Sequence, residues 1–153
     1  MVGSAEPYVS RVSVETDAKP LKLLPLDAVH RGLGAKFAPF AGYDMPVQYE
    51  GLIAEHRWTR ENAGLFDVSH MGPCFLRIAA GSGLEGAAAH EKVAAIVEPL
   101  VAADIAGLAP GQQRLTVLLN PDGGILDDLI ISRPAEPHEQ GGLYIVVNGG
   151  VKE

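Results

Sequence analysis

Two apolar runs joined by a short polar segment predict a β-hairpin over residues 114–132. The runs are Leu115–Leu119 and Ile125–Ser132, and both have the length and composition of strands. Residues 120–124, Asn-Pro-Asp-Gly-Gly, are expected to form the turn, because their glycines readily adopt positive φ. A third apolar run, residues 143–148, follows a polar loop and predicts a last strand.

Helical spacing and composition predict three helices, over residues 24–33, 51–63 and 84–97. In the first, Leu26, Val29 and Leu33 recur on one face. Gly64 follows the second, where glycine commonly ends a helix as the C′ residue. The third is rich in alanine and should stop near Pro99.

Shorter strands are expected over residues 36–40, at the start of 65–72, and over 75–79. Residues 41–49 mix glycine, proline and aromatic residues without a period, so we expect an ordered loop there. Residues 1–23 read as a polar, poorly ordered leader before one domain at 24–153. The whole pattern predicts an α+β fold, a mainly antiparallel sheet with helices.

Composition limits the classes of function. The chain has 153 residues, 47% of them hydrophobic, with a net charge of −7. A packed core is therefore expected, and an acidic chain is a poor match for nucleic acid or an anionic membrane. The single cysteine, Cys74, cannot form an internal disulfide. We find no apolar run of membrane-spanning length and no apolar signal core in the first twenty residues, so the cytosol is the expected compartment.

Adjacent carboxylates in the second hairpin strand are the sharpest candidate for chemistry. Successive strand residues point to opposite faces, so Asp127 and Asp128 should not share one site. The rest of this strand is apolar on both faces, which is typical of a strand covered on both sides. A buried carboxylate needs a partner, a ligand or a shifted pKa. The alternative is that both accept backbone N–H bonds near the turn.

Asp67, Ser69 and His70 crowd together in the segment Phe-Asp-Val-Ser-His-Met, but a hydrolase triad is poorly supported. Triad members are recognised by geometry, and no G-x-S-x-G motif surrounds Ser69. The five histidines lack metal-binding spacing, and no metal is expected. His90, on the alanine-rich helix, is most simply explained as solvent-exposed.

Several segments together resemble the glycine cleavage T-protein family, which is a family of aminomethyltransferases. The similar segments are PFAGYDMPVQY at 39–49, GLFDVSHMG at 64–72, LLNPDGGILDDLII at 118–131 and LYIVVN at 143–148. The resemblance runs from about Leu24 to the end of the chain and covers only the N-terminal part of the family's folate-binding fold. Because full members are more than twice this length, we expect the chain to be truncated.

The resemblance implies a function and a set of site residues. The family transfers a one-carbon unit from the aminomethyl-lipoyl H-protein to tetrahydrofolate and releases ammonia, without a metal. By resemblance the catalytic acid is Asp128, with Asp127 structural. The implied folate contacts are Met71, Leu115, Val146 and Asn148. For Leu115 and Val146, plain core packing is the alternative. The implied partners are H-protein, tetrahydrofolate and, for a fragment, a separate C-terminal half; nucleic acid and membranes are not expected.

Two other readings remain open. The chain could be the folate domain of a sarcosine or dimethylglycine dehydrogenase relative, or a non-catalytic folate-binding protein of the same fold. A protein that only binds folate has less need of a carboxylate at position 128.

Overall fold

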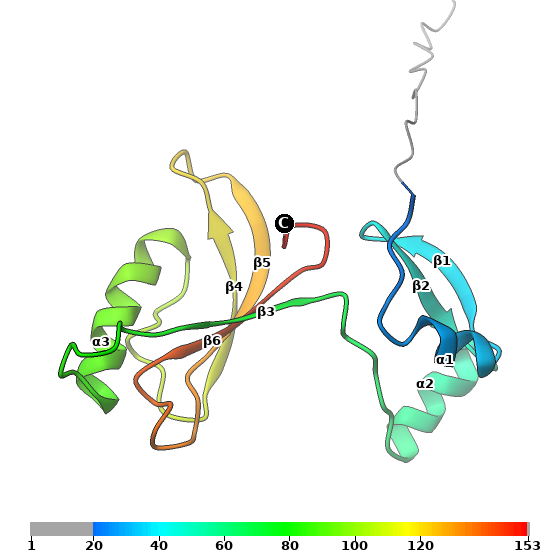
Figure 1. Cartoon of the computed structure of the whole chain (residues 1–153), viewed down its shortest axis with the longest axis horizontal. Coiled ribbons are helices and arrows are strands. Elements are labelled where there is room, and N and C mark those ends of the chain that lie inside the picture. Colours follow the sequence, from blue (N-terminus) through cyan, green and yellow to red (C-terminus); the bar gives the residue numbers. More distant parts are fainter. Residues whose placement is uncertain (1–19, 153) are drawn as a thin grey trace, which may run out of the picture.

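The chain folds into two lobes joined by an extended segment, as a computed structural model that describes residues 20–152 shows (Figure 1). The N-terminal lobe, residues 20–61, contains α1 (Asp27–Gly32), β1 (Lys36–Phe40), β2 (Tyr43–Gln48) and α2 (Leu52–Glu61). The sheet lobe, residues 72–152, contains β3 (Gly72–Leu76), α3 (Gly86–Val97), the 3₁₀ helix η1 (Glu98–Leu100), β4 (Gln113–Leu119), β5 (Ile125–Ser132) and β6 (Leu143–Val147).

The sheet lobe is built on four antiparallel strands in the order β3-β6-β5-β4. The hairpin predicted over residues 114–132 is confirmed as the β4–β5 pair, and the last predicted strand is β6. Together with the helices this makes an α+β fold, as the sequence pattern predicts.

One face of this sheet carries the main core. Leu129, Ile131 and Leu143 point to this face and are almost completely buried. They pack against α3 and the loop after it, through side chains including Val93 and Ile105. Burying a side chain of this size contributes roughly 1.5–3 kcal/mol, so this face stabilises the lobe.

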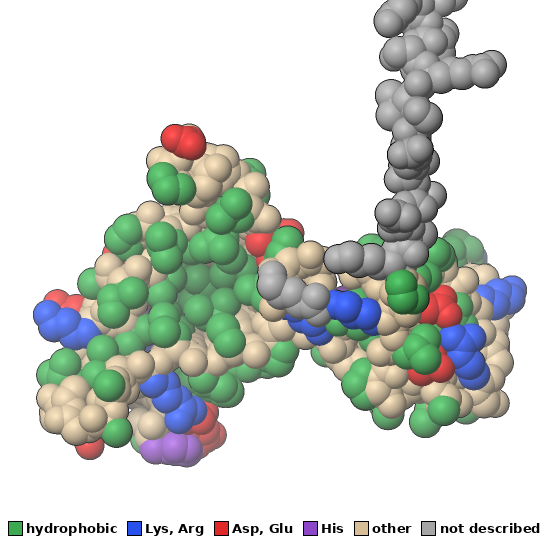
Figure 2. Space-filling model, turned by 45° about the horizontal axis from the view of Figure 1, so that its top comes forward, with side chains coloured by type: hydrophobic (Ala, Val, Ile, Leu, Met, Phe, Trp, Pro, Cys, Tyr) green, Lys and Arg blue, Asp and Glu red, His purple; other side chains and the backbone are tan. Residues whose placement is uncertain are grey.

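The opposite face of the sheet, here called the open face, has no helix over it in the described residues (Figure 1). Leu115 is 70% exposed there, Leu126 54% and Phe75 53%. Figure 2 shows hydrophobic side chains gathered over the middle of this lobe. The expectation that β5 is covered on both sides is therefore wrong for this chain, because α3 covers only one of its faces.

The N-terminal lobe has a small core of its own, formed by Leu24, Tyr43 and Met45. Residues 41–49, expected to be a loop, instead contain β2, which pairs with β1. The sequence pattern does not reveal this strand, because it lies in a two-stranded ribbon. Its edge away from β1 is bridged at Tyr43 by Lys22. Pro46, which lacks an N–H, is tolerated at such an edge.

The three predicted helices exist, but with shifted ends and a different buried face in the first. Pro25 disfavours helical backbone at the residue before it, so α1 begins only at Asp27. Val29 and Leu33, on its expected apolar face, are exposed, and His30 is its buried residue. The second helix, α2, has no buried residue, and its C-cap Asn62 is extended, so Gly64 is not its C′ residue.

The segment between the lobes, residues 62–71, is not the strand expected at 65–72. Asp67 explains this, because its carboxylate accepts the Ser69 N–H at 2.8 Å. Local side-chain bonds of this kind compete with strand pairing. At the other end of the chain, residues 1–19 of the expected leader lie outside the described residues. Within the described part, Lys22 pairs with Tyr43 as an isolated bridge.

Candidate functional site

Strand register brings most of the predicted site residues to the open face. Leu115 on β4 lies opposite Ile130 on β5, and Ile130 lies opposite Val146 on β6. Asp128 lies two residues from Ile130 and therefore projects from the same face, opposite Val117. An apolar row with a carboxylate beside it thus crosses three neighbouring strands.

Asn148 lies directly after β6, where the pairing of β6 with β5 has stopped. Its Nδ2 donates to the Asp128 carbonyl oxygen at 2.8 Å and to Asp128 Oδ1 at 3.0 Å. The same Nδ2 lies 2.8 Å from Asp127 Oδ1, and the Asn148 backbone N–H donates to Asp127 Oδ2 at 3.0 Å. Beyond the last β5–β6 backbone pair, the Asn148 side chain therefore supplies a hydrogen bond to the backbone of β5.

The expectation that Asp127 and Asp128 could not share one site is therefore wrong. Their Cβ atoms do leave the strand on opposite faces, but both carboxylates bend to the same amide nitrogen. This is possible because Asn148 lies beside the edge of β5, within reach of both faces. Asp127 uses both carboxylate oxygens in this contact, whereas Asp128 uses one.

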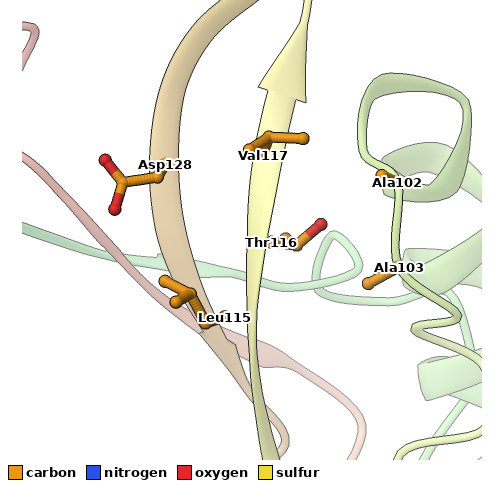
Figure 3. A pocket seen from close by; sticks show the side chains of 6 residues that line it. All are labelled: Ala102, Ala103, Leu115, Thr116, Val117 and Asp128. Atoms are coloured by element: carbon orange, nitrogen blue, oxygen red, sulfur yellow. The ribbon is translucent and has the colours of Figure 1, made fainter.

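Asp128 differs from Asp127 in its access to solvent. Asp128 is exposed, and Asp127 is half-buried. Asp128 also lines a hollow of about 370 Å³ along β4, together with Ala102, Ala103, Leu115, Thr116 and Val117. Figure 3 shows Asp128 and Leu115 on one side of the β4–β5 pair, with the Thr116 hydroxyl turned toward Ala102 and Ala103. The arrangement leaves Asp128, rather than Asp127, able to meet a ligand.

Met71 lies at the same end of the sheet as Asn148. It directly precedes β3, whose first residue, Gly72, is paired with Val147. Met71 is partly buried, and its N–H donates to the carbonyl of Val68 in a tight turn. All five predicted site residues therefore lie on the open face or at its Asn148 end.

Asp67 forms a cluster with His30 and Tyr49, and not the triad with Ser69 and His70 that its sequence neighbours suggest. Its Oδ2 accepts a hydrogen bond from His30 Nε2 at 2.8 Å, and His30 Nδ1 lies 2.6 Å from the Tyr49 hydroxyl. The Ser69 N–H donates to Asp67 Oδ1, but the histidine bonded to this carboxylate is His30 and not His70, so the triad interpretation finds no support. Residue spacing gives no signal for this cluster, because its members lie 19 and 37 positions apart.

Hydrogen bonds within this cluster set the charge of Asp67. Burial raises the pKa of Asp67, but the hydrogen bonds from His30 and Ser69 outweigh it and lower that pKa to about 2. Asp67 is thus ionised at neutral pH, and His30 Nε2 must carry the proton that it donates.

His90 is buried, contrary to expectation, and only 3% exposed. Its Nε2 contacts the Ile105 carbonyl oxygen at 3.1 Å, and its Nδ1 has no hydrogen-bond partner among the described residues. Within residues 20–152, no group of three His, Cys, Asp or Glu side chains is placed to hold a metal ion. No helix in that range is long and apolar enough to cross a membrane.

Comparison with known proteins assigns the family. The GCVT N-terminal domain matches residues 26–153. An aminomethyltransferase of Flavobacterium psychrophilum is 42% identical over 128 residues, which is 84% of this chain and 31% of the relative. The mitochondrial aminomethyltransferase of Gallus gallus is 41% identical over 143 residues, 93% of this chain and 32% of that protein.

A solved structure is similar to this chain over the same N-terminal part. The crystal structure of glycine cleavage system aminomethyltransferase T from Bartonella henselae matches with a TM-score of 0.66 and 40% identity, covering 85% of this chain and 32% of that chain. The chain spans about a third of the length of the relatives that it matches. Its family is nevertheless clear from residues 26–153, and the chain belongs to the GCVT N-terminal domain family.

Proposed function

We propose that this chain carries the folate-binding face of an aminomethyltransferase of the glycine cleavage system. In that role it serves transfer of the one-carbon unit from the aminomethyl-lipoyl H-protein to tetrahydrofolate, with release of ammonia. One observation carries the proposal: register gathers Leu115, Val146 and Asp128 on one open face, with Asn148 at its end. The names of the relatives support the same reaction.

In this proposal the apolar row binds the flat pterin ring, and the polar end orients it. Leu115 and Val146 cover one ring face, and Met71 closes the site from the segment between the lobes. The Asn148 amide nitrogen is occupied by Asp127 and Asp128, so its carbonyl oxygen is the group left to accept a hydrogen bond from the pterin edge.

Asp128 supplies the fixed negative charge. A folate amine must be unprotonated and oriented to attack, and transfer of the methylene group develops positive iminium character. An anion held in place can accept or orient the proton and stabilise that charge. The Asn148 amide, 3.0 Å from Asp128 Oδ1, fixes the carboxylate without neutralising it.

The described residues build one wall of the site. Ligand pockets usually enclose most of a ligand of this size, so we propose that a further region of the family's length supplies the opposite wall. That region would be part of a longer protein or a separate C-terminal half. The lipoylated H-protein is the proposed macromolecular partner.

A folate titration observed at methionine tests the proposal directly. The protein has three methionines, Met1, Met45 and Met71. With ¹³C-methyl labelling, tetrahydrofolate should shift the Met71 signal and leave that of Met45, which lies in the N-terminal core, unchanged. Met71→Leu and Met45→Leu assign the signals. Even weak, millimolar binding produces such shifts.

Two controls make the titration specific. Leu115→Ala should weaken binding, because it removes part of the apolar row. p-Aminobenzoylglutamate has the folate tail without the pterin ring, so it should not shift Met71. The absence of any tetrahydrofolate-dependent shift, or an equal response to the tail alone, would contradict the proposed site.

A further inference from the structure

The segment that carries Met71 has no secondary structure to hold it. Residues 63–68 are irregular, and a turn follows at Ser69 and His70. Met71 ends this segment directly before β3, and its N–H donates to the Val68 carbonyl at 2.9 Å. Its position therefore depends on this turn, on β3 and on the side-chain contacts that place the turn. Its segment passes between the two lobes, so these contacts can come from either side (Figure 1).

Contacts from the N-terminal lobe fix this segment at Asp67. Both Asp67 oxygens are engaged, one by His30 Nε2 and one by the Ser69 N–H, each at 2.8 Å. The side chains of His30 and Asp67 are each only 9% exposed. The Tyr49 hydroxyl, 2.6 Å from His30 Nδ1, prevents the ring from turning. His30 of α1 thus contacts both the residue after β2 and the segment between the lobes.

Contacts from the sheet lobe fix the other end of the segment. A Cβ added to Gly149 would lie 2.6 Å from the His70 carbonyl oxygen, and one added to Gly72 would lie 2.7 Å from Val147. The first distance shows close backbone packing beside Asn148, and the second shows close packing of Gly72 against the Val147 side chain. The His70 ring also packs edge-on against Phe40 of β1, in the N-terminal lobe, with centroids 6.1 Å apart. Asp67 is linked to Met71 by the turn between them, because its carboxylate accepts the Ser69 N–H and the Val68 carbonyl accepts the Met71 N–H. A shift at Asp67 would therefore act on Met71 through this turn.

We propose that His30 is a positioning residue of the folate site, which acts by holding Asp67 and thereby placing Met71 against the pterin ring. This inference rests on the proposed function and extends it to residues that do not touch the ligand. His30 itself is buried between Tyr49 and Asp67 and makes its contribution through Met71.

The test compares two neighbouring residues of α1. His30→Ala removes the contact with Asp67, whereas Arg31→Ala removes bonds to Asp27 and Asp44, which lie within the N-terminal lobe. In the full chain with labelled methionines, His30→Ala should move the Met71 signal before ligand is added. It should also weaken tetrahydrofolate binding by roughly tenfold, the size of coupling found between residues in contact. Arg31→Ala should do neither.

A double-mutant cycle separates positioning from general destabilisation. If His30 acts through Met71, His30→Ala should weaken binding little further in a Met71→Ala background. Tyr49→Phe removes only the hydroxyl that holds the ring and should give a smaller effect in the same direction. This variant keeps the test decisive if His30→Ala fails to fold.

The outcomes distinguish the two proposals. If the unaltered chain shows no tetrahydrofolate-dependent shift, the proposed function fails, and this inference fails with it. If the chain binds and Leu115→Ala weakens binding, but His30→Ala and Tyr49→Phe leave Met71 and the affinity unchanged, the inference alone is wrong. Fully additive effects of His30→Ala and Met71→Ala would likewise assign His30 a purely structural role.

Discussion

The neighbouring carboxylates Asp127 and Asp128 share a partner, yet their hydrogen bonds are not equivalent. Asp127 accepts from the Asn148 backbone with one oxygen and from its side chain with the other. Asp128 accepts from that side chain with a single oxygen and has solvent on its other side. An amide has only one acceptor oxygen. Replacing the carboxylate by an amide therefore removes a hydrogen bond at position 127, where both oxygens accept, but not at position 128, where one oxygen accepts.

For this pair we expect Asp127→Asn to cost stability and Asp128→Asn to cost function. In the Asp127→Asn variant, the new NH₂ group would point at one of the two N–H donors of Asn148 that Asp127 now accepts from. The lost hydrogen bond should lower the free energy of unfolding by roughly 1–3 kcal/mol. The Asp128 amide can keep its bond to Asn148, so the fold should survive. Its lost charge should abolish methylene transfer, assayed with H-protein and tetrahydrofolate after the remaining family region is supplied.

Denaturant unfolding of both variants is the measurement that separates them. Near-normal turnover of the Asp128 variant would remove this residue from the mechanism. Unchanged stability of the Asp127 variant combined with lost turnover would reverse the two assignments.

His90 makes the stability of the sheet lobe sensitive to pH. Burial, with Arg133 nearby, lowers the pKa of His90 from its ordinary value of 6.5. Below pH 6.5 the unfolded chain therefore binds a proton that the folded chain does not. The unfolding free energy should fall as the pH drops through this range, by up to about 1.4 kcal/mol per pH unit from this one group.

Replacing His90 should remove this part of the pH dependence. His90→Gln keeps a donor for the Ile105 carbonyl but cannot take up a proton, so its profile should be flatter between pH 7 and pH 5. His138→Gln, in an exposed loop, is the matched control. The measurement is the denaturation midpoint at each pH; equal slopes for His90→Gln and the unaltered chain would refute the assignment.

At the scale of single residues, the sequence proposes candidate site residues but does not predict their contacts. Motif resemblance points to Asp128 and Asn148, and register then places both at one end of the sheet. Their shared hydrogen bonds could not be predicted, because Asn148 reaches β5 from a strand 20 residues away. His30 was hidden for the same reason: its partners come from two other segments.

Among the elements, the β4–β5 hairpin is the one most fully specified by local sequence. Asn120 Oδ1 accepts the N–H groups of Asp122 and Gly124, at 3.0 and 2.6 Å. Gly123 has φ +80°, which glycine adopts without strain. Because all these contacts lie within five residues, the local sequence is enough to predict the turn. The strand β2 cannot be predicted in this way, since its pairing with β1 and its bridge to Lys22 determine it.

We expect Asn120→Ala to destabilise the hairpin by roughly 1–2 kcal/mol, since two backbone donors lose their acceptor. Asn120→Asp keeps the acceptor oxygen and should retain most of the stability. Asp122→Ala removes an exposed side chain from the same turn and serves as the control. Thermal unfolding of the three variants measures the difference, and equal losses for Asn120→Ala and Asp122→Ala would show that the side-chain bonds contribute little.

For the whole molecule, the two faces of the main sheet determine how the chain behaves alone. α3 covers one face, and the other presents Leu115, Leu126 and Phe75 at more than half of their maximal exposure. β3 and β4 are both edge strands of the sheet. Large exposed apolar patches and free edges favour association in solution. The same face that would hold a pterin ring is thus also the face most prone to self-association.

We therefore predict that the chain of 153 residues self-associates at micromolar concentration and shows no measurable aminomethyl transfer by itself. Within residues 20–152 the apolar row has no opposite wall, and each missing polar partner would cost a ligand roughly 1 kcal/mol or more. Leu115→Lys combined with Leu126→Lys should shift the chain toward monomer, because charges on the open face oppose its burial. Leu33→Lys, in the N-terminal lobe at a position that is 66% exposed, is the matched control. Light scattering after size exclusion measures the mass across a concentration series. A monomer at every concentration, or an equal effect of Leu33→Lys, would mean that the open face is not the surface of association. Turnover by the chain alone would mean that the open face is sufficient for the reaction without an opposite wall.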